Sequence, residues 1–280
     1  MTETSDRVVM ITGCSSGIGR SMAQQVLKRG DRGVATARRP ETLSDLVDER
    51  CHVKRLDVTD AESIEAAVSA AIDWAGRIDV LVNNAGYGLI APVAEVREED
   101  LRRQLETNIV GAVAVIRAVV PHMAERGNGC IVNIGSVSAV MATPYGGAYS
   151  ASKAALHLLS DSLRVELQPF GVNVVVVRAG ALATEFANTA AGGIEGYGGP
   201  DSLYNAMAEG IEIRARMSEN LAMPAEAFAR RVMDKVCRPN PPAVIKIGGG
   251  SRLVPVLAML PKKLLAKMLG KKFGLQARRA

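Results

Sequence analysis

Short runs rich in valine and isoleucine alternate with helical stretches along most of this 280-residue chain. We expect strands at residues 8–12, 34–37, 53–56, 80–83, 130–134, 172–178 and 243–247. Between them, helical periodicity predicts helices at 17–29, 60–75, 98–126, 148–168 and 225–236. Strands that are apolar almost throughout belong to parallel sheets covered on both faces. The order therefore predicts a single-domain α/β fold, a doubly wound parallel sheet with helices on both faces.

A glycine-rich turn, Thr12-Gly-Cys-Ser-Ser-Gly-Ile-Gly19, follows the first expected strand and opens the first expected helix. Glycine permits positive φ and lets the backbone approach a pyrophosphate, whose charge then meets the helix N-terminus. A glycine triplet alone is weak evidence, and its alternative is a turn that merely packs tightly. Because this turn lies between strand and helix at the start of a βα series, it favours a dinucleotide site.

The second expected strand ends in Ala37-Arg38-Arg39-Pro40. An acidic residue here would bind the adenosine ribose hydroxyls of NAD and repel a 2′-phosphate. A guanidinium instead suits a phosphate by its charge and its bidentate geometry. We therefore expect the cofactor to be NADP(H), with Arg38 as the phosphate ligand and Arg39 as a solvated neighbour.

From Arg7 to about Thr184 the chain resembles the short-chain dehydrogenase/reductase family. Besides the glycine turn, Asn83-Asn-Ala-Gly86, Ser136 and Tyr149-x-x-x-Lys153 occur in that family's order and spacing. The resemblance implies a catalytic tetrad of Asn108, Ser136, Tyr149 and Lys153. It also implies a dimer or tetramer formed through the helices that hold Asn108 and Tyr149. The expected cofactor contacts are Gly13, Ser15, Ser16, Gly17, Ile18, Gly19, Arg38, Asp57, Val58, Asn84, Ala85, Gly86, Tyr149, Lys153, Gly180 and Thr184.

Tyr149 and Lys153 lie four residues apart on an expected helix, so their side chains share one face. An ammonium beside a phenol favours the phenolate, and the positive nicotinamide would add to this, lowering the pKa of Tyr149 from about 10 toward neutrality. Tyr149 would then exchange a proton with a carbonyl oxygen that Ser136 orients, while the cofactor transfers the hydride. Asn108 falls within an expected helix, where asparagine is unfavourable because its short side-chain amide competes for backbone hydrogen bonds. For it the resemblance implies a proton relay through Lys153.

We expect a substrate lid at residues 180–223, because this long connection contains five glycines between residues 192 and 199. The family usually has Pro-Gly before this lid, whereas here Ala179 precedes Gly180. We expect Thr184 to reach the nicotinamide amide beneath a lid that lacks the stiffening proline. Apolar residues flanking the expected pocket predict a fairly apolar, steroid-like or lipid-like ketone substrate: Leu89, Ile90, Met141, Leu182 and Phe186.

Residues 1–250 would thus form the dinucleotide-binding and catalytic domain, followed by a basic, apolar tail at 251–280. The tail holds eight Lys or Arg and no acidic residue, so the rest of the chain is net negative, which argues against a nucleic-acid groove. Leu264, Leu265, Met268 and Leu269 form one stripe among lysines. That stripe can lie on an anionic membrane or pack on protein. In this apolar, basic tail the chain resembles some lipid-metabolising members of the family, including acyl-dihydroxyacetone-phosphate reductases and hydroxysteroid dehydrogenases.

The four cysteines are far apart and no histidine stands at zinc-finger spacing, so we expect neither disulfides nor a metal site. The first residues are polar, and the apolar run behind them is too short for a signal sequence. These features favour the cytoplasm, with peripheral membrane contact left open.

The sequence thus favours an NADPH-dependent oxidoreductase that acts on a small carbonyl or alcohol. A regulatory or scaffold protein that binds NADP(H) without turnover is one alternative, against which the complete tetrad speaks. A non-redox isomerase or dehydratase is another, because a fold does not fix a reaction.

Overall fold

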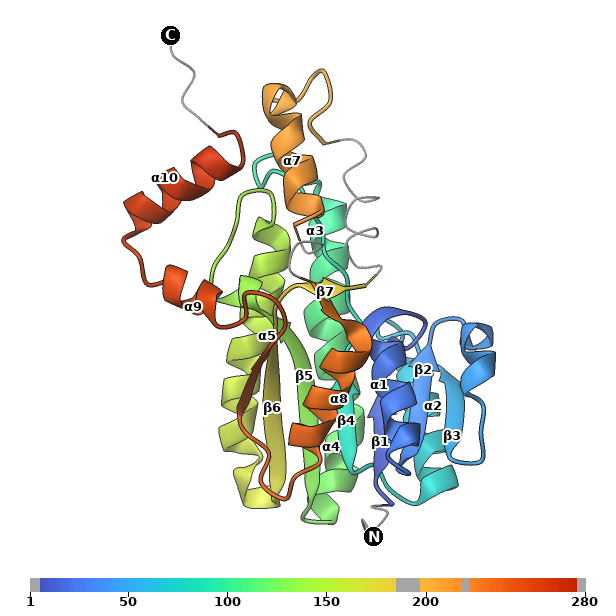
Figure 1. Cartoon of the computed structure of the whole chain (residues 1–280). Coiled ribbons are helices and arrows are strands. Elements are labelled where there is room, and N and C mark those ends of the chain that lie inside the picture. The colour runs from blue at the N-terminus through green and yellow to red at the C-terminus, as the bar shows by residue number, and fades with distance from the viewer. Residues whose placement is uncertain (1–5, 185–196, 218–221, 276–280) are drawn as a thin grey trace.

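In the computed structural model, seven parallel strands form one sheet between two layers of helices (Figure 1). The structure describes residues 6–184, 197–217 and 222–275. The sheet runs in the order β3-β2-β1-β4-β5-β6-β9. Its strands are β1 (Val8–Ile11), β2 (Arg32–Ala37), β3 (Cys51–Arg55), β4 (Val80–Asn83), β5 (Gly129–Ser136), β6 (Val172–Ala179) and β9 (Val244–Ile247). The single-domain, doubly wound α/β fold predicted from the sequence is confirmed.

The apolar strands are explained by the two helical layers. In β1, Val9 and Ile11 belong to one buried cluster, while Val8 and Met10 belong to the cluster on the opposite face. Neighbouring residues of a strand point to opposite faces, so both must be apolar when both faces are covered. One layer holds α1 (Gly17–Lys28) and α8 (Ala225–Val236); the other holds α2 (Ala61–Ala75), α4 (Gly111–Glu125) and α5 (Gly147–Glu166).

The helix expected at residues 98–126 is interrupted. It consists of α3 (Glu98–Leu105), a π-helical turn (Glu106–Val110) and α4. The turn carries Asn108, which is 1% exposed and whose Nδ2 donates to the Tyr87 carbonyl and to Ser152 Oγ, both at 3.0 Å. A π-turn inserts one extra residue into a helix and is frequent at functional sites.

Several elements differ from the sequence prediction in extent. The expected strand and helix ends shift by no more than two residues, and a two-stranded parallel ribbon, β7 (Leu182–Ala183) with β8 (Met223–Pro224), was not predicted. Within the expected lid, α7 (Ala208–Ala215) is preceded by a 3-10 turn (Asn205–Met207). Residues 185–196 and 218–221 of the lid, which include Phe186 and three of its five clustered glycines, lie outside the described residues.

The tail forms α9 (Leu253–Leu257) and α10 (Lys262–Lys272) and ends against the lid. Phe273 is completely buried among Ile90, Tyr145, Ile211 and Ala215, the last two from α7. The stripe predicted for α10 is divided. Leu265 is buried and Leu269 packs against the Phe273 cluster, but Leu264 and Met268 remain 46% and 45% exposed.

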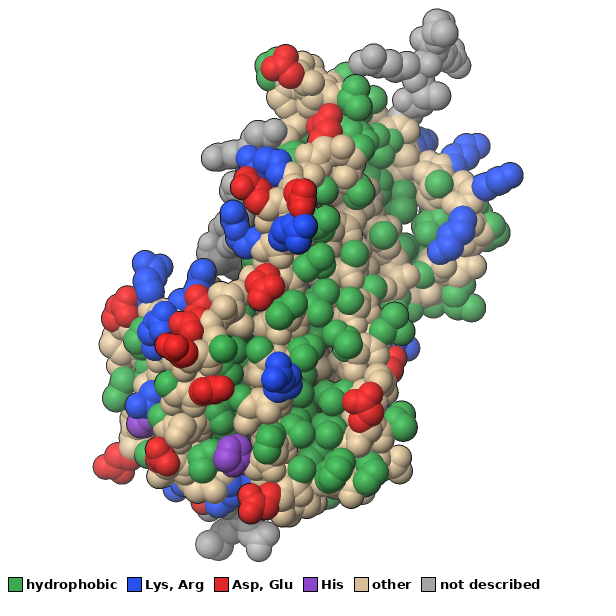
Figure 2. Space-filling view, turned by 180° about the vertical axis from the view of Figure 1, so that it is seen from behind, with side chains coloured by type: hydrophobic (Ala, Val, Ile, Leu, Met, Phe, Trp, Pro, Cys, Tyr) green, Lys and Arg blue, Asp and Glu red, His purple; other side chains and the backbone are tan. Residues whose placement is uncertain are grey.

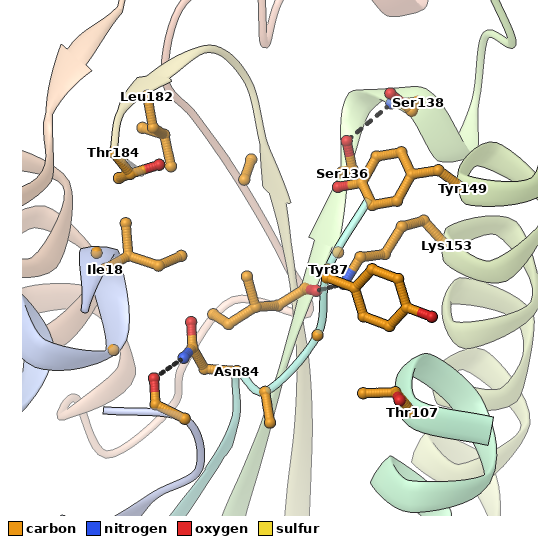
Figure 3. A pocket seen from close by; sticks show the side chains of 18 of the residues that line it. Ile18, Asn84, Tyr87, Thr107, Ser136, Ser138, Tyr149, Lys153, Leu182 and Thr184 are labelled. Carbon is orange, nitrogen blue, oxygen red and sulfur yellow. Dashed lines mark hydrogen bonds between the residues drawn. The ribbon is translucent and has the colours of Figure 1, made fainter. Parts of the chain in front are cut away.

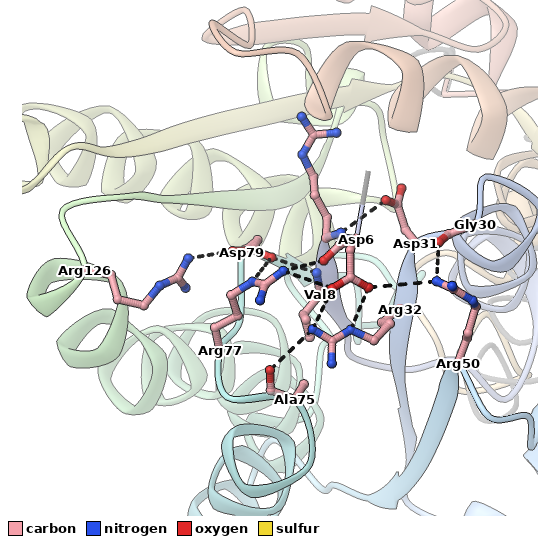
Figure 4. Close-up of polar contacts among 11 residues, drawn as sticks. Asp6, Val8, Gly30, Asp31, Arg32, Arg50, Ala75, Arg77, Asp79 and Arg126 are labelled. Atoms are coloured by element: carbon pink, nitrogen blue, oxygen red, sulfur yellow. Dashed lines mark hydrogen bonds and ion pairs between the residues drawn. The ribbon is translucent and has the colours of Figure 1, made fainter. Parts of the chain in front are cut away.

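At the amino ends of the strands, a network of charged side chains ties β1 to β4 (Figure 4). Asp79 accepts hydrogen bonds from the Val8 N–H at 2.8 Å, from Arg77 Nε at 3.0 Å and from an Arg126 Nη at 2.6 Å. Burial alone would raise the pKa of Asp79, but these bonds outweigh burial and hold the pKa below its ordinary value. The Asp79 carboxylate therefore stabilises the folded state.

Replacing Asp79 with asparagine should lower the free energy of unfolding by about 1.5–3 kcal/mol at pH 7, because hydrogen bonds to a charged group are lost. A carboxyl whose pKa is depressed by folding contributes stability above its unfolded pKa of about 3.9, and loses it as pH falls through the folded pKa. Urea unfolding at pH 7 and pH 3 should thus show a gap that narrows in acid. Asp73→Asn, exposed on α2, is the matched control; an equal effect of both changes would contradict the assignment.

Candidate active site

A cavity of about 730 Å³ lies at the carboxyl ends of the strands, where the chain order reverses between β1 and β4. Ligands of doubly wound folds bind at this switch point. The cofactor contacts expected from the sequence, which run from Gly13 to Thr184 in chain order, all lie on the cavity wall. Gly13 and Thr184 are 171 positions apart in the sequence, and the fold brings both to the same cavity.

The glycine-rich turn fits a phosphate group. A Cβ on Gly19 would overlap the Gly13 carbonyl oxygen and the Asn84 amide, and Gly13 and Gly17 have φ of 72° and 59°. Ser16, the N-cap of α1, makes no side-chain cap hydrogen bond, and the first turn of α1 contains no acidic residue. The N–H groups of this helix end are therefore suited to an anion.

Thr12 fastens this turn to the loop after β4. Its Oγ1 accepts hydrogen bonds from the N–H groups of Asn84 and Ala85, each at 3.0 Å. In return, Asn84 Nδ2 donates to the carbonyls of Thr12 and Gly13 at 2.8 and 2.9 Å, and Figure 3 shows Asn84 turned toward this turn. Sequence reasoning assigned no role to Thr12, although a hydroxyl directly after a buried strand was a usable signal.

The adenosine end of the cavity is formed after β2 and β3. Arg38 is exposed and lies on the wall, whereas Arg39 does not line it. Asp57 accepts hydrogen bonds from the backbone and hydroxyl of Thr59 at 3.0 and 2.8 Å. Burial would raise the pKa of Asp57, but these bonds and the charges of Arg38 and Arg55 hold it below its ordinary value. Asp57 is therefore ionised and acts as a hydrogen-bond acceptor.

Ser136, Tyr149 and Lys153 meet on the opposite wall (Figure 3). Ser136 ends β5, and the other two lie one turn apart near the start of α5. The Ser136 and Tyr149 side chains are hydrogen-bonded to each other, and Ser136 Oγ accepts from the Ser138 N–H at 3.1 Å. Lys153 Nζ donates to the Ile134 carbonyl at 2.8 Å and lies 6.0 Å from the Tyr149 ring centroid.

Without the charge of a nicotinamide, the low pKa expected for Tyr149 does not occur. Burial raises the pKa of the phenol, although the hydrogen bond with Ser136 and the charge of Arg214 act in the opposite direction. Burial also lowers the pKa of Lys153 to about 8. The i, i+4 spacing correctly places the two groups on one face of α5. It does not show how far the site is shielded from water, and this desolvation is the largest contribution to both pKa shifts.

Asn108, the fourth expected catalytic residue, lies behind the wall and does not line the cavity. Its Oδ1 accepts from the Tyr87 N–H at 3.1 Å, in addition to the bonds of its Nδ2. A Cβ added to Gly86 would lie 2.9 Å from the same Oδ1 and 3.8 Å from Lys153 Nζ. Asn108 thus shapes the loop at Gly86 and Tyr87 beside Lys153, as a positioning residue.

The substrate end of the wall differs from the apolar lining expected from the sequence. Leu182 lines the cavity, but Leu89 and Ile90 are buried behind it and Met141 is not on the wall. Residues that sequence reasoning missed lie there instead, from the loop after β4, from α3, from the lid and from the tail: Tyr87, Arg103, Arg214, Met217, Val254 and Lys272. No local motif marks these residues, because only the tertiary fold brings them together.

Cys14, within the glycine turn, is a buried structural residue. It is completely inaccessible, and burial raises the pKa of its thiol to about 12. Because the thiolate is the nucleophilic form of cysteine, this thiol is inert at neutral pH.

The sequence profile of the family described as short chain dehydrogenase matches residues 7–193. A 3-ketodihydrosphingosine reductase of Bacteroides thetaiotaomicron is 34% identical over 243 residues, which are 86% of this chain and 88% of that protein. The chain belongs to the short-chain dehydrogenase/reductase family. The resemblance inferred from the motifs is confirmed.

Solved structures of this short-chain dehydrogenase/reductase fold agree. A short-chain dehydrogenase from Streptomyces avermitilis has a TM-score of 0.80 and 31% identity, covering 98% of this chain and 99% of its own. A serine dehydrogenase complexed with NADP+ has a TM-score of 0.75 and 28% identity, covering 88% and 96%. Similar structures also hold NAD. The protein is therefore an oxidoreductase that uses a nicotinamide cofactor, and the fold alone does not choose between the two forms.

Proposed function

We propose that this short-chain dehydrogenase/reductase reduces a carbonyl group of a lipid-like substrate with NADPH, and that the reaction is reversible. The observation that carries the proposal is that the pair Ser136 and Tyr149, with Lys153 beside it, lines the same cavity as the glycine turn. An acid and an orienting hydroxyl thus face a site suited to a dinucleotide.

The residues present fit NADP(H). The glycine turn and the start of α1 would hold the pyrophosphate, Arg38 the 2′-phosphate, and Asp57 and Val58 the adenine, while Thr184 would reach the nicotinamide amide. When bound, the cofactor supplies the hydride. All further steps in the mechanism belong to side chains of this chain.

In the reductive direction, Ser136 donates a hydrogen bond that orients the carbonyl oxygen, and Tyr149 gives its proton to that oxygen. The raised pKa of Tyr149 keeps the phenol protonated at neutral pH, which is the form that donates. Lys153 lies beside the phenol and can resupply a proton from its ammonium. Asn108 holds the loop next to Lys153, which is consistent with a relay at this point.

Two comparisons support the finer points of the proposal. The serine dehydrogenase relative carries NADP+, as Arg38 suggests for this chain. The relative named 3-ketodihydrosphingosine reductase indicates a ketone on a long-chain substrate. A cavity of about 730 Å³ falls within the range of about 300–1,000 Å³ for small-molecule sites.

The direct test follows the absorbance of NADPH and of NADH with a panel of ketones that differ in chain length. We expect turnover with NADPH and higher kcat/KM for long-chain ketones than for acetone. Tight NADPH binding without turnover of any carbonyl would contradict the proposal and favour a regulatory protein.

We further propose a homo-oligomer formed through α4 and α5. Figure 2 shows apolar side chains gathered across the face opposite α1 and α8. Val110, in the π-helical turn before α4, is 50% exposed, and Leu158 and Val165 on α5 are 72% and 70% exposed. Glu98–Glu125 is also apolar and long enough to cross a membrane by length and composition alone, but its inner face packs on the sheet. An exposed apolar patch on such a helix fits a protein interface.

Leu158→Glu should therefore reduce the oligomer to a smaller species without unfolding it, because a charge in an apolar interface is costly. Sedimentation velocity of the variant and the unmodified protein measures this. Leu203→Glu, 78% exposed outside these helices, is the control. A monomeric unmodified protein would contradict the proposed oligomer.

We also propose that the protein is cytoplasmic and that its tail contacts a membrane surface. Leu253, Val256 and Met259 are 60%, 60% and 84% exposed, and α10 adds Leu264 and Met268 among its lysines. Exposed apolar side chains among cations suit an anionic lipid surface.

The full-length protein should float with liposomes that contain phosphatidylserine, and less with neutral liposomes. Met259→Glu together with Met268→Glu should abolish flotation, while Phe273 and the lid remain packed. Leu203→Glu, 78% exposed on the lid, is the control for a lost apolar side chain elsewhere. Equal flotation of the tail variant and the unmodified protein would remove the membrane proposal.

A further inference from the structure

Arg214, on the lid helix α7, is an unusual residue for a cavity wall because it is charged and only 7% exposed. Its Nε donates a hydrogen bond to Thr143 Oγ1 at 2.6 Å. Within the part of the chain that the structure describes, no carboxylate lies at ion-pair distance from its guanidinium. A neutral hydroxyl is thus the hydrogen-bond partner of a buried cation.

The position of Arg214 is next to the reacting groups. A Cβ added to Gly146, the N-cap of α5, would lie 2.8 Å from an Arg214 Nη, and Tyr149 follows three residues later. The charge of Arg214 is felt by the Tyr149 phenol. In Figure 1, α7 lies above α3 and α5, away from β2 and β3 at the adenosine end of the site. Arg214 therefore belongs to the substrate end of the cavity.

Other charges at this end have the same sign. Arg103 and Lys272 also line the cavity, and Asp57 at the adenosine end is the acidic residue among the described lining residues. Burying a cation costs several kcal/mol unless an anion or several hydrogen bonds compensate. The guanidinium also offers five donors in a planar fork, which matches a carboxylate or a phosphate.

Two simpler roles explain less of this arrangement. If Arg214 only fastened the lid to Thr143, a neutral donor such as glutamine would suffice without the cost of burying a charge. The phosphates of the cofactor, in turn, are matched by the glycine turn and by Arg38. Among the described residues, no anion matches the charge of Arg214.

We propose that Arg214 binds an acidic group, carboxylate or phosphate, of the carbonyl substrate, and that Lys272 at the cavity wall adds a second positive charge. This inference rests on the proposed function and narrows it. The substrate is then an amphipathic ketone with an apolar body and an anionic group near the carbonyl, rather than a wholly apolar one.

The test uses matched ketone pairs with NADPH. One pair is 4-oxododecanoate and its methyl ester, and the other is 1-O-decyl dihydroxyacetone phosphate and its dephosphorylated form. The unmodified enzyme should show a kcat/KM about 10- to 100-fold higher for the anionic member of at least one pair, as expected for hydrogen bonds to a charged group. The pair with the larger ratio identifies carboxylate or phosphate as the preferred group.

Arg214→Met should lower kcat/KM much more for the anionic than for the neutral member of that pair, and Arg214→Lys should keep part of the preference. Thr143→Val removes the anchoring hydrogen bond but leaves the charge, so the preference should survive. Arg231→Met, exposed on α8, controls for the loss of a positive charge. An unmodified enzyme without preference, or equal losses for neutral and anionic ketones in Arg214→Met, would overturn the inference.

A binding experiment separates this inference from the proposed function. Calorimetry of 4-oxododecanoate and of the phosphate ketone, each added to the unmodified protein and to Arg214→Met with NADP+ present, measures anion binding without turnover. Weaker binding to Arg214→Met supports the anion site even if no ketone is reduced. Equal binding to both proteins overturns the site even if neutral ketones are reduced.

Discussion

Replacing Tyr149 with phenylalanine is expected to lower kcat for ketone reduction by about 10²- to 10⁴-fold, the usual contribution of a positioned acid. The change removes the hydroxyl that is hydrogen-bonded to Ser136 and keeps the ring that fills the buried site. The cofactor cradle at the glycine turn is untouched, so NADPH should bind as before. Initial rates and NADPH fluorescence titrations of the same preparations measure the two effects.

Tyr145→Phe is a close control for this change. Tyr145 lies four residues earlier, is also buried, and its hydroxyl has no hydrogen-bond partner in the described structure. Losing that hydroxyl should leave turnover nearly unchanged. Comparable activity of Tyr149→Phe and the unmodified enzyme would refute Tyr149 as the proton donor.

The rate of ketone reduction should fall at high pH. Burial lowers the pKa of Lys153 to about 8 and raises that of Tyr149, so both groups are protonated at pH 7. Reduction should therefore be nearly constant below pH 8 and decline above it, as Lys153 loses its proton first.

The sheet and the cofactor half of the site could be predicted because their signals are local. Strands such as β1 are apolar throughout, which indicates that both faces of the sheet are covered. Gly13, Gly17 and Gly19 indicate a tight turn before a helix. Tyr149 and Lys153 are likewise linked by one turn of α5. Each of these features is decided within a few residues of sequence.

The substrate half could not be predicted because its contacts are not local. Arg214 meets Thr143 across 71 residues, and Phe273 joins Ile211 and Tyr145 in one cluster. The raised pKa of Tyr149 likewise depends on how completely the surrounding elements exclude water. Burial of this kind is a property of the assembled fold, whereas the motif fixes only the identity and spacing of the groups.

Arg38→Asp is expected to reverse the cofactor preference, changing the ratio of kcat/KM for NADPH to that for NADH by about 10²- to 10⁴-fold. Removing a charged hydrogen bond to the 2′-phosphate costs about 1.5–3 kcal/mol, and the new carboxylate adds repulsion of similar size. The same carboxylate can accept hydrogen bonds from the ribose hydroxyls of NADH, which strengthens the reversal.

Arg39→Asp separates the effect of a direct contact with the 2′-phosphate from a general effect of surface charge. It makes the same change in charge one residue later, but Arg39 does not line the cavity. A contact with the 2′-phosphate predicts a large effect at Arg38 and a small one at Arg39, whereas a general attraction between a basic surface and an anionic cofactor predicts similar effects at both. Only the general attraction should weaken strongly with salt, because exposed charges are screened over about 10 Å at 0.1 M ionic strength. A preference for NADH in the unmodified enzyme would reject Arg38 as a determinant of cofactor choice.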